Sequence, residues 1–201
     1  MNKKKPGELK ILRTFYPESE YSLINSSENP DFILKDNSSN ILFGVEVTQY
    51  FDTPTSGRFK NIPNYVGRLL SKNFIHKEDI GNLKVIDTIF KIEDDGTETP
   101  LSAGVLRSLP QSPERIEALK RLVASKNSKY SQYDKTLESI DLLIYDSGDL
   151  VAGIDKQKSE ILAYLRKQEE SNTLKSPFRK IILVIEESKY KLIKIVLKSS
   201  N

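Results

Sequence analysis

Two short apolar runs on either side of a cluster of turn-forming residues constrain the fold of this chain more than any other feature. The runs are residues 32–35 and 41–50, and residues 36–40, Asp-Asn-Ser-Ser-Asn, separate them. Asp, Asn and Ser favour turns because their side chains can hydrogen-bond to nearby backbone groups. The pattern therefore predicts two antiparallel strands joined as a β-hairpin.

The second run alternates in a way that assigns its side chains to two faces. Val45 and Val47 alternate with Glu46 and Thr48, and successive side chains of a strand point to opposite faces of a sheet. Glu46 and Thr48 therefore share a face, and the hairpin brings Asp31, at the start of the first strand, close to Glu46. Two neighbouring carboxylates repel each other unless a cation lies between them, and oxygen ligands suit a divalent cation. Asp31 and Glu46 are thus predicted metal ligands.

The segments Pro30-Asp31 and Gly44-Val45-Glu46-Val47-Thr48 together resemble the motif of the PD-(D/E)xK nuclease superfamily. That motif has an Asp at a strand start, an acidic residue on the next strand and a Lys two positions later. Here Thr48 stands at the position of the lysine. The resemblance covers roughly residues 8–146. It implies an α/β, restriction-endonuclease-like sandwich, in which helices flank a central mixed β-sheet with the core order αβββαβ, followed by a C-terminal helix and β-hairpin.

A lysine on a later helix is the candidate replacement for the missing one. Ser112-Pro113-Glu114 has the features of a helix start, and the helix should extend to about residue 130. At about 100° per residue, Lys126 falls within an apolar stripe of this helix, formed by Ile116, Leu119, Leu122, Val123 and Tyr130. Burying an unpaired ammonium is costly, so either the helix frays near Ser125 and Lys126 is solvated, or Lys126 points toward Asp31 and Glu46. Some members of the superfamily are thought to carry their lysine on this helix.

Three further groups are candidates for the site. The resemblance implies a third metal ligand from the carbonyl of Val47 and a further acid from the first helix, for which Glu8 is preferred over Glu20. Thr48 shares the face of Glu46, although a β-branched residue in a strand needs no functional explanation. Each acid also has an ordinary structural alternative, because Asp31 could serve only as a turn residue and Glu46 only as a solvent-facing strand residue.

Composition excludes several classes of mechanism. The 201 residues include no cysteine and a single histidine, His76, which excludes disulfides, thiolate catalysis and cysteine-ligated zinc. No nucleophile motif surrounds His76. The chain has no apolar run near eighteen residues and no apolar signal region after Met1, so we expect a cytoplasmic protein that does not enter membranes. A net charge of +3 permits nucleic-acid binding without requiring it.

The remaining elements complete a single domain over residues 1–201, with an insertion at about residues 51–111. Within the insertion, the sequence predicts a helix over residues 65–74 and a strand over residues 83–92. Elsewhere it predicts strands over residues 21–25 and 139–146, an amphipathic helix over residues 155–170, and a terminal hairpin of residues 178–185 and 190–197 around a turn at 186–189.

The leading interpretation is a nuclease that depends on Mg²⁺ or Mn²⁺ and hydrolyses phosphodiester bonds. By the resemblance, DNA is the expected substrate, in a restriction, repair or phage-defence role, and a homodimer is compatible with it. The alternative is a nuclease-like module that has lost catalysis and binds nucleic acid or a protein partner. A third interpretation is an unrelated α/β protein in which the two acids are incidental. The direction of Lys126 and the separation of the carboxylates distinguish these interpretations.

Overall fold

The computed structural model describes residues 5–107, 110–146, 163, 167, 176–188 and 191–199. The chain divides into two compact units, one made of Met1–Phe51 and Ser112–Asn201, the other of Asp52–Gln111. The second unit occupies the segment in which the sequence predicts an insertion. Of the helix expected over residues 155–170, the structure describes only residues 163 and 167, both of them helical, and the rest of this prediction lies outside the described residues. No helix among the described residues combines the length and the apolar character needed to cross a bilayer.

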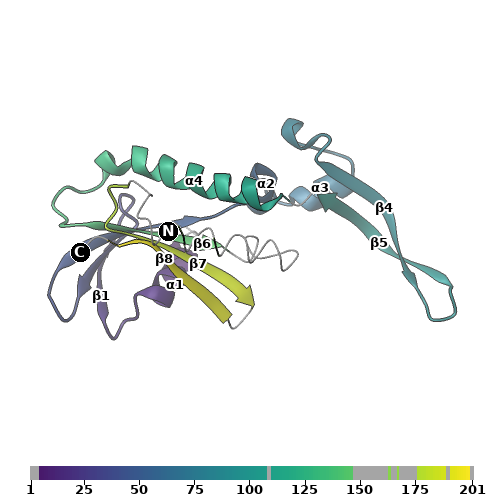
Figure 1. Cartoon of the computed structure of the whole chain (residues 1–201). Helices are drawn as coiled ribbons and strands as arrows, with labels where there is room; N and C mark the ends of the chain where they lie inside the picture. The colour runs from purple at the N-terminus through teal and green to yellow at the C-terminus, as the bar shows by residue number, and fades with distance from the viewer. Residues whose placement is uncertain are drawn as a thin grey trace. The chain divides into compact units, whose positions relative to one another are not determined.

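The first unit is built around a six-stranded mixed sheet (Figure 1). Its strands run in the order β1-β2-β3-β6-β7-β8, with β3, β6 and β7 parallel and the other neighbours antiparallel. The elements of this unit are α1 (Lys5–Phe15), β1 (Tyr21–Ser26), β2 (Phe32–Asp36), β3 (Leu42–Gln49), α4 (Ser112–Ser128), the 3-10 turn η2 (Tyr130–Gln132), β6 (Ile140–Asp146), β7 (Lys180–Ser188) and β8 (Lys191–Ser199).

Helices pack on both faces of this sheet (Figure 1). On one face, Leu12 of α1 packs in a buried cluster with Val45 and Val47 of β3. On the other face, Leu119 and Val123 of α4 pack against β6 and β7. The valines of β3 thus face α1, and by strand alternation Glu46 faces the side of the sheet that α4 covers. The general α/β architecture expected from the sequence is confirmed.

Two predicted elements end at different residues. Helix α3 ends at Leu70 instead of residue 74, because Lys72 adopts a left-handed conformation with φ 57° and the N–H of Asn73 turns back to the carbonyl of Arg68, a common way for a helix to end. Strand β7 continues to Ser188, although the sequence predicts a turn over residues 186–189. The strand is longer because Glu186 and Ser188 pair with Leu192 and Lys191 of β8.

The second unit combines short helices with a long two-stranded ribbon (Figure 1). Its elements are α2 (Pro54–Asn61), α3 (Tyr65–Leu70), the 3-10 turn η1 (Lys77–Asp79), β4 (Leu83–Ile92) and β5 (Glu98–Arg107). The fully buried carboxylate of Asp79 holds the helical end together, since it accepts hydrogen bonds from Thr55, Tyr65 and Arg58. Hydrogen bonding from Arg58 is the main cause that lowers the pKa of Asp79, so this carboxylate is ionised and structural.

Candidate functional site

Asp31 and Glu46 lie side by side on one face of the β2–β3 hairpin. The register pairs Phe32 with Val45 across the antiparallel strands, and Asp31 and Glu46 are the next residues along each strand. The two residues are 9% and 7% exposed. The backbone N–H of Val47 donates a hydrogen bond of 2.9 Å to Oδ2 of Asp31, which ties the first acid to the strand of the second. The structure therefore brings the two predicted carboxylates together.

A close approach at Gly44 helps to position Asp31. A Cβ atom on Gly44 would lie 2.5 Å from Cγ of Pro30 and 3.1 Å from Cδ1 of Leu137. A residue with a side chain would therefore displace Pro30, which directly precedes Asp31. Glycine within a strand often marks such a close approach. The glycine of the Gly-Val-Glu-Val-Thr segment thus has a packing role in the site.

Lys126 reaches the same site from helix α4. Its ammonium Nζ lies 2.7 Å from Oε1 of Glu46, and the Lys126 side chain is 19% exposed. Val123 is buried in the core, and residues three apart on a helix lie on the same face, so the packing that buries Val123 directs Lys126 to the sheet. Of the two positions that the sequence left open for Lys126, the structure has the one that points toward the acids.

The carboxyl of Glu46 is in an electrostatically unfavourable position. Burial is the main cause that raises its pKa above the ordinary value of 4.5, and the negative charge of Asp31 raises it further, while Lys126 lowers it through its hydrogen bond and charge. Oε2 of Glu46 is buried and accepts no hydrogen bond. A buried carboxylate oxygen without a donor is costly, and a cation is one ligand that would satisfy it.

Tyr133 is a fourth member of the site that the sequence analysis missed. It is buried, and its ring contacts those of Tyr130 and Phe178 at centroid distances of 5.8 and 6.0 Å. Burial is the main cause that raises the pKa of its hydroxyl, and the charges of Glu46 and Asp31 and a side-chain interaction with Glu46 add to the effect. The hydroxyl therefore lies near both carboxylates, without a hydrogen bond of ordinary geometry to Oε2 of Glu46. Tyr133 follows η2, outside any periodic pattern, so the sequence carried no signal for it.

The other candidate residues take different positions. Thr48 is half-buried on β3, on the same face as Glu46 by strand alternation. Glu8 is buried on α1, but α1 packs on the valine face of β3, opposite to the face of Glu46. Val47 contributes its backbone, whose N–H binds Asp31.

Asp31 and Glu46 offer a small set of oxygen donors for a divalent cation. Among the described residues, no three His, Cys, Asp or Glu side chains form a group that could hold a metal. Mg²⁺, however, usually binds through one or two carboxylates, and waters and substrate phosphates complete its octahedron. Asp31 and Glu46 provide two carboxylates, and the buried Oε2 of Glu46 lacks a donor. The residues therefore fit a cation of this kind.

A second buried polar cluster lies on the opposite face, where α1 packs. Asp141 of β6 is fully buried and accepts a hydrogen bond of 2.6 Å from the hydroxyl of Tyr16. Arg179 donates two hydrogen bonds to the same carboxylate, at 2.9 and 2.6 Å, and lies over the ring of Phe43. These partners match the charge of Asp141, so the cluster joins elements of the fold and needs no ligand.

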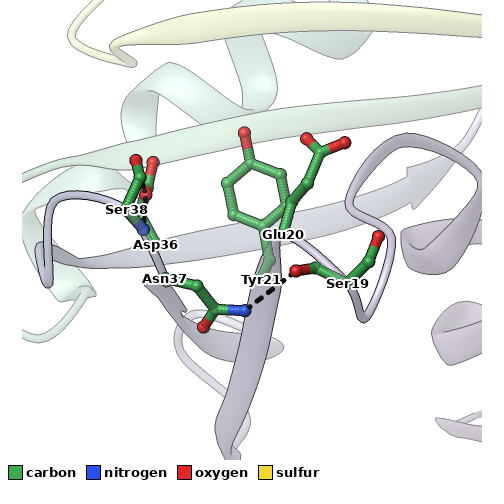
Figure 2. A pocket seen from close by; sticks show the side chains of 6 residues that line it. All are labelled: Ser19, Glu20, Tyr21, Asp36, Asn37 and Ser38. Carbon is green, nitrogen blue, oxygen red and sulfur yellow. Dashed lines mark hydrogen bonds between the residues drawn. The ribbon is translucent and has the colours of Figure 1, made fainter.

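An open hollow of about 470 Å³ lies beside the turn that joins β2 to β3 (Figure 2). It is lined by Ser19, Glu20, Tyr21, Asp36, Asn37 and Ser38. The Asn37 amide donates to the Ser19 carbonyl (Figure 2), and Oδ1 of Asp36 accepts from the hydroxyl and the N–H of Ser38. These hydrogen bonds stabilise the turn, so the hollow has the features of ordinary loop packing.

Comparison with known proteins found no matching family model, no matching curated protein and no matching solved structure.

Proposed function

We propose that this chain is a divalent-metal-dependent nuclease that hydrolyses phosphodiester bonds, with DNA as its substrate. The observation that carries the proposal is the convergence of two adjacent buried carboxylates, Asp31 and Glu46, with the ammonium of Lys126 at 2.7 Å from the second. The order of one helix, three strands, a helix and a strand in the first unit, with helices on both faces of a mixed sheet, supports a restriction-endonuclease-like sandwich.

Each residue of the site would have its own role in the hydrolysis. Asp31 and Glu46 would hold Mg²⁺ or Mn²⁺, with the Val47 carbonyl as a further oxygen ligand. When bound, the cation would acidify a water molecule and neutralise charge on the phosphate. Lys126, a compact positive charge, would orient the attacking water and offset the charge that develops on the phosphate. Thr48 leaves the position of the motif lysine without a positive charge, so Lys126 supplies that charge from α4.

The test is incubation of plasmid DNA, linear DNA and RNA with Mg²⁺ or Mn²⁺. We expect the wild type to cleave DNA, and Asp31→Ala, Glu46→Ala and Lys126→Ala to lose about 100-fold or more of the rate, the usual effect of removing an electrostatic group from an active site. Glu138→Ala and Lys129→Ala are matched controls, because both residues are exposed. Undiminished cleavage by Asp31→Ala would contradict the assignment of the site.

Cation binding should be measured separately by titration calorimetry in the absence of nucleic acid. The wild type and the two control variants are expected to bind Mn²⁺, and Asp31→Ala is expected not to bind it. A wild-type protein that binds Mn²⁺ and DNA but leaves every substrate intact would instead indicate a nuclease-like binding module without catalysis.

A further inference from the structure

The β4–β5 ribbon of the second unit exposes side chains of one face at both of its ends. The register pairs Lys84 with Leu106, Ile86 with Gly104 and Ile92 with Glu98. Two irregularities interrupt the pairing with β5 in the stretch of β4 from Ile86 to Phe90. Across this stretch both strands advance by the same number of residues, so the two shifts in register cancel. Side chains alternate between faces, so the members of these pairs share one face with Phe90. We call this the ribbon face.

The ribbon face carries more exposed apolar side chains than we expect of a two-stranded hairpin in water. Leu106, Phe90 and Ile92 are 53%, 51% and 71% exposed. At the helical end, Ile80 is 65% exposed and bridges to Leu83, next to Lys84. Large apolar groups gathered on one surface mark an interaction site, and a two-stranded ribbon is marginally stable by itself.

Charge is distributed unequally between the two ends of the ribbon. Residues 90–98, at the turn end, include four acidic residues and one lysine. Residues 60–84, at the helical end, include five basic residues and two acids, Glu78 and Asp79, and both acids form ion pairs with Arg58. On the ribbon face itself, Glu98 lies at the acidic end and Lys84 at the basic end. Each end has apolar side chains next to its charges.

We propose that the ribbon face binds the ribbon face of a second copy of this chain, in an antiparallel two-fold dimer. A two-fold axis brings the same surface of each copy together, so that residue i meets residue j and residue j meets residue i. Antiparallel packing places Phe90, Ile92 and Glu98 of one copy against Leu106 and Lys84 of the other. The apolar groups are then covered twice, and each acidic end meets a basic end.

The charge pattern selects a second copy over other occupants. A polyanion would be attracted to the helical end and repelled by the turn end, and an acidic or a basic protein surface would likewise match only half of the face. An antiparallel copy matches both halves, because complementary charges then oppose each other at each end. The proposal concerns the second unit alone and is independent of the nuclease assignment.

The test is sedimentation velocity of the full-length chain over a wide concentration series. We expect the wild type to pass from monomer to dimer as concentration rises, and the dissociation constant to increase with salt because charge pairs are screened. Ile92→Ser, which removes the most exposed apolar side chain of the face, is expected to weaken self-association about tenfold.

Two charge-reversal variants make the test specific. Asp94→Lys with Glu98→Lys makes both ends of the ribbon basic, and Lys77→Glu with Lys84→Glu makes both ends acidic; these four residues are exposed. Each variant alone is expected to be monomeric, because like charges meet at both ends of the homodimer. An equimolar mixture is expected to form a heterodimer, since every contact then joins opposite charges.

Recovery of the dimer in the mixture would also show that both variants are folded. Three results would overturn the proposal: a wild type that stays monomeric at every concentration, a charge-reversal variant that dimerises as well as the wild type, or a mixture of two folded variants, checked by circular dichroism, that remains monomeric.

Discussion

At the scale of single residues, Glu46 occupies an electrostatically costly position that is central to the candidate site. Its carboxyl is buried beside Asp31, and one of its oxygens has no hydrogen-bond donor. Lys126 compensates only part of the cost, because the pKa of Glu46 is raised in spite of the ion pair. Such an arrangement is typical of a site that is completed by a ligand, where stability is given up for binding.

Glu46→Gln should therefore stabilise the protein in the absence of divalent cations. The folded-state pKa of Glu46 is raised, so in the wild type stability is fully present below the unfolded pKa and is lost as pH rises through the folded pKa. The variant lacks this loss. We expect its free energy of unfolding to match the wild type at low pH and to exceed it by about 0.5–2 kcal/mol near neutral pH.

Urea denaturation at a series of pH values measures this difference, with Glu138→Gln as the control at an exposed position. Equal stability of Glu46→Gln and wild type at every pH would show that burial of Glu46 has no electrostatic cost.

Sequence could locate three of the four site residues because each has a periodic signal. Asp31 and Glu46 follow from the alternation and turn of the hairpin, and Lys126 follows from the apolar stripe of its helix. Tyr133 has no such signal. It lies after the helix, and its ring belongs to the buried cluster of Leu119, Val123 and Phe178, in which Phe178 comes from a strand entry far along the chain.

At the scale of elements, the sequence predicts neither helix α2 nor strand β5. The reasons differ between the two. Helix α2 has a recognisable start, since the Thr53 side chain caps the N–H of Ser56 and proline follows directly, but Gly57 lowers its helix propensity. Strand β5 contains Pro100 and Gly104, both unfavourable in strands. The strand forms because it pairs with β4, and the residues of β5 alone do not indicate that pairing.

Gly44→Ala tests how strand β3 positions the residue before Asp31. The added Cβ would overlap Pro30 at 2.5 Å, so we expect a loss of about 1–3 kcal/mol in stability, as for other overpacked sites, and weaker Mn²⁺ binding. Gly7→Ala is the matched control, because its Cβ would meet nothing within 4 Å and alanine favours the helix by about 0.5–1 kcal/mol.

Unfolding in urea gives the stability of both glycine variants, and calorimetry gives their Mn²⁺ affinity. Wild-type stability and Mn²⁺ affinity in Gly44→Ala would mean that the Pro30 contact does not position Asp31.

At the scale of the whole molecule, the candidate active site and the ribbon belong to different units. Asp31, Glu46, Lys126 and Tyr133 all lie in the first unit, and the ribbon face lies in the second. Within the first unit, the end of β3 and the start of α4 are joined by a hydrogen bond of 3.0 Å from the Tyr50 hydroxyl to the Arg115 carbonyl. The two points at which the first unit is interrupted, after Phe51 and before Ser112, are therefore close together.

Replacing residues 52–111 with a short Gly/Ser linker between Phe51 and Ser112 should then leave the cation site intact, since closing a short loop costs little when its ends are near. We expect the shortened chain to fold and to gain about 2.7 kcal/mol of stability when the Mn²⁺ concentration is a hundred times its Kd, while remaining monomeric because the ribbon face is gone. The same chain with Asp31→Ala should gain no stability from Mn²⁺.

Calorimetric unfolding with and without Mn²⁺ compares the shortened chain with the full-length protein. Cation stabilisation that appears only in the full-length chain would show that the second unit contributes to the site, whereas stabilisation of both chains would establish that the cation site depends on the first unit alone.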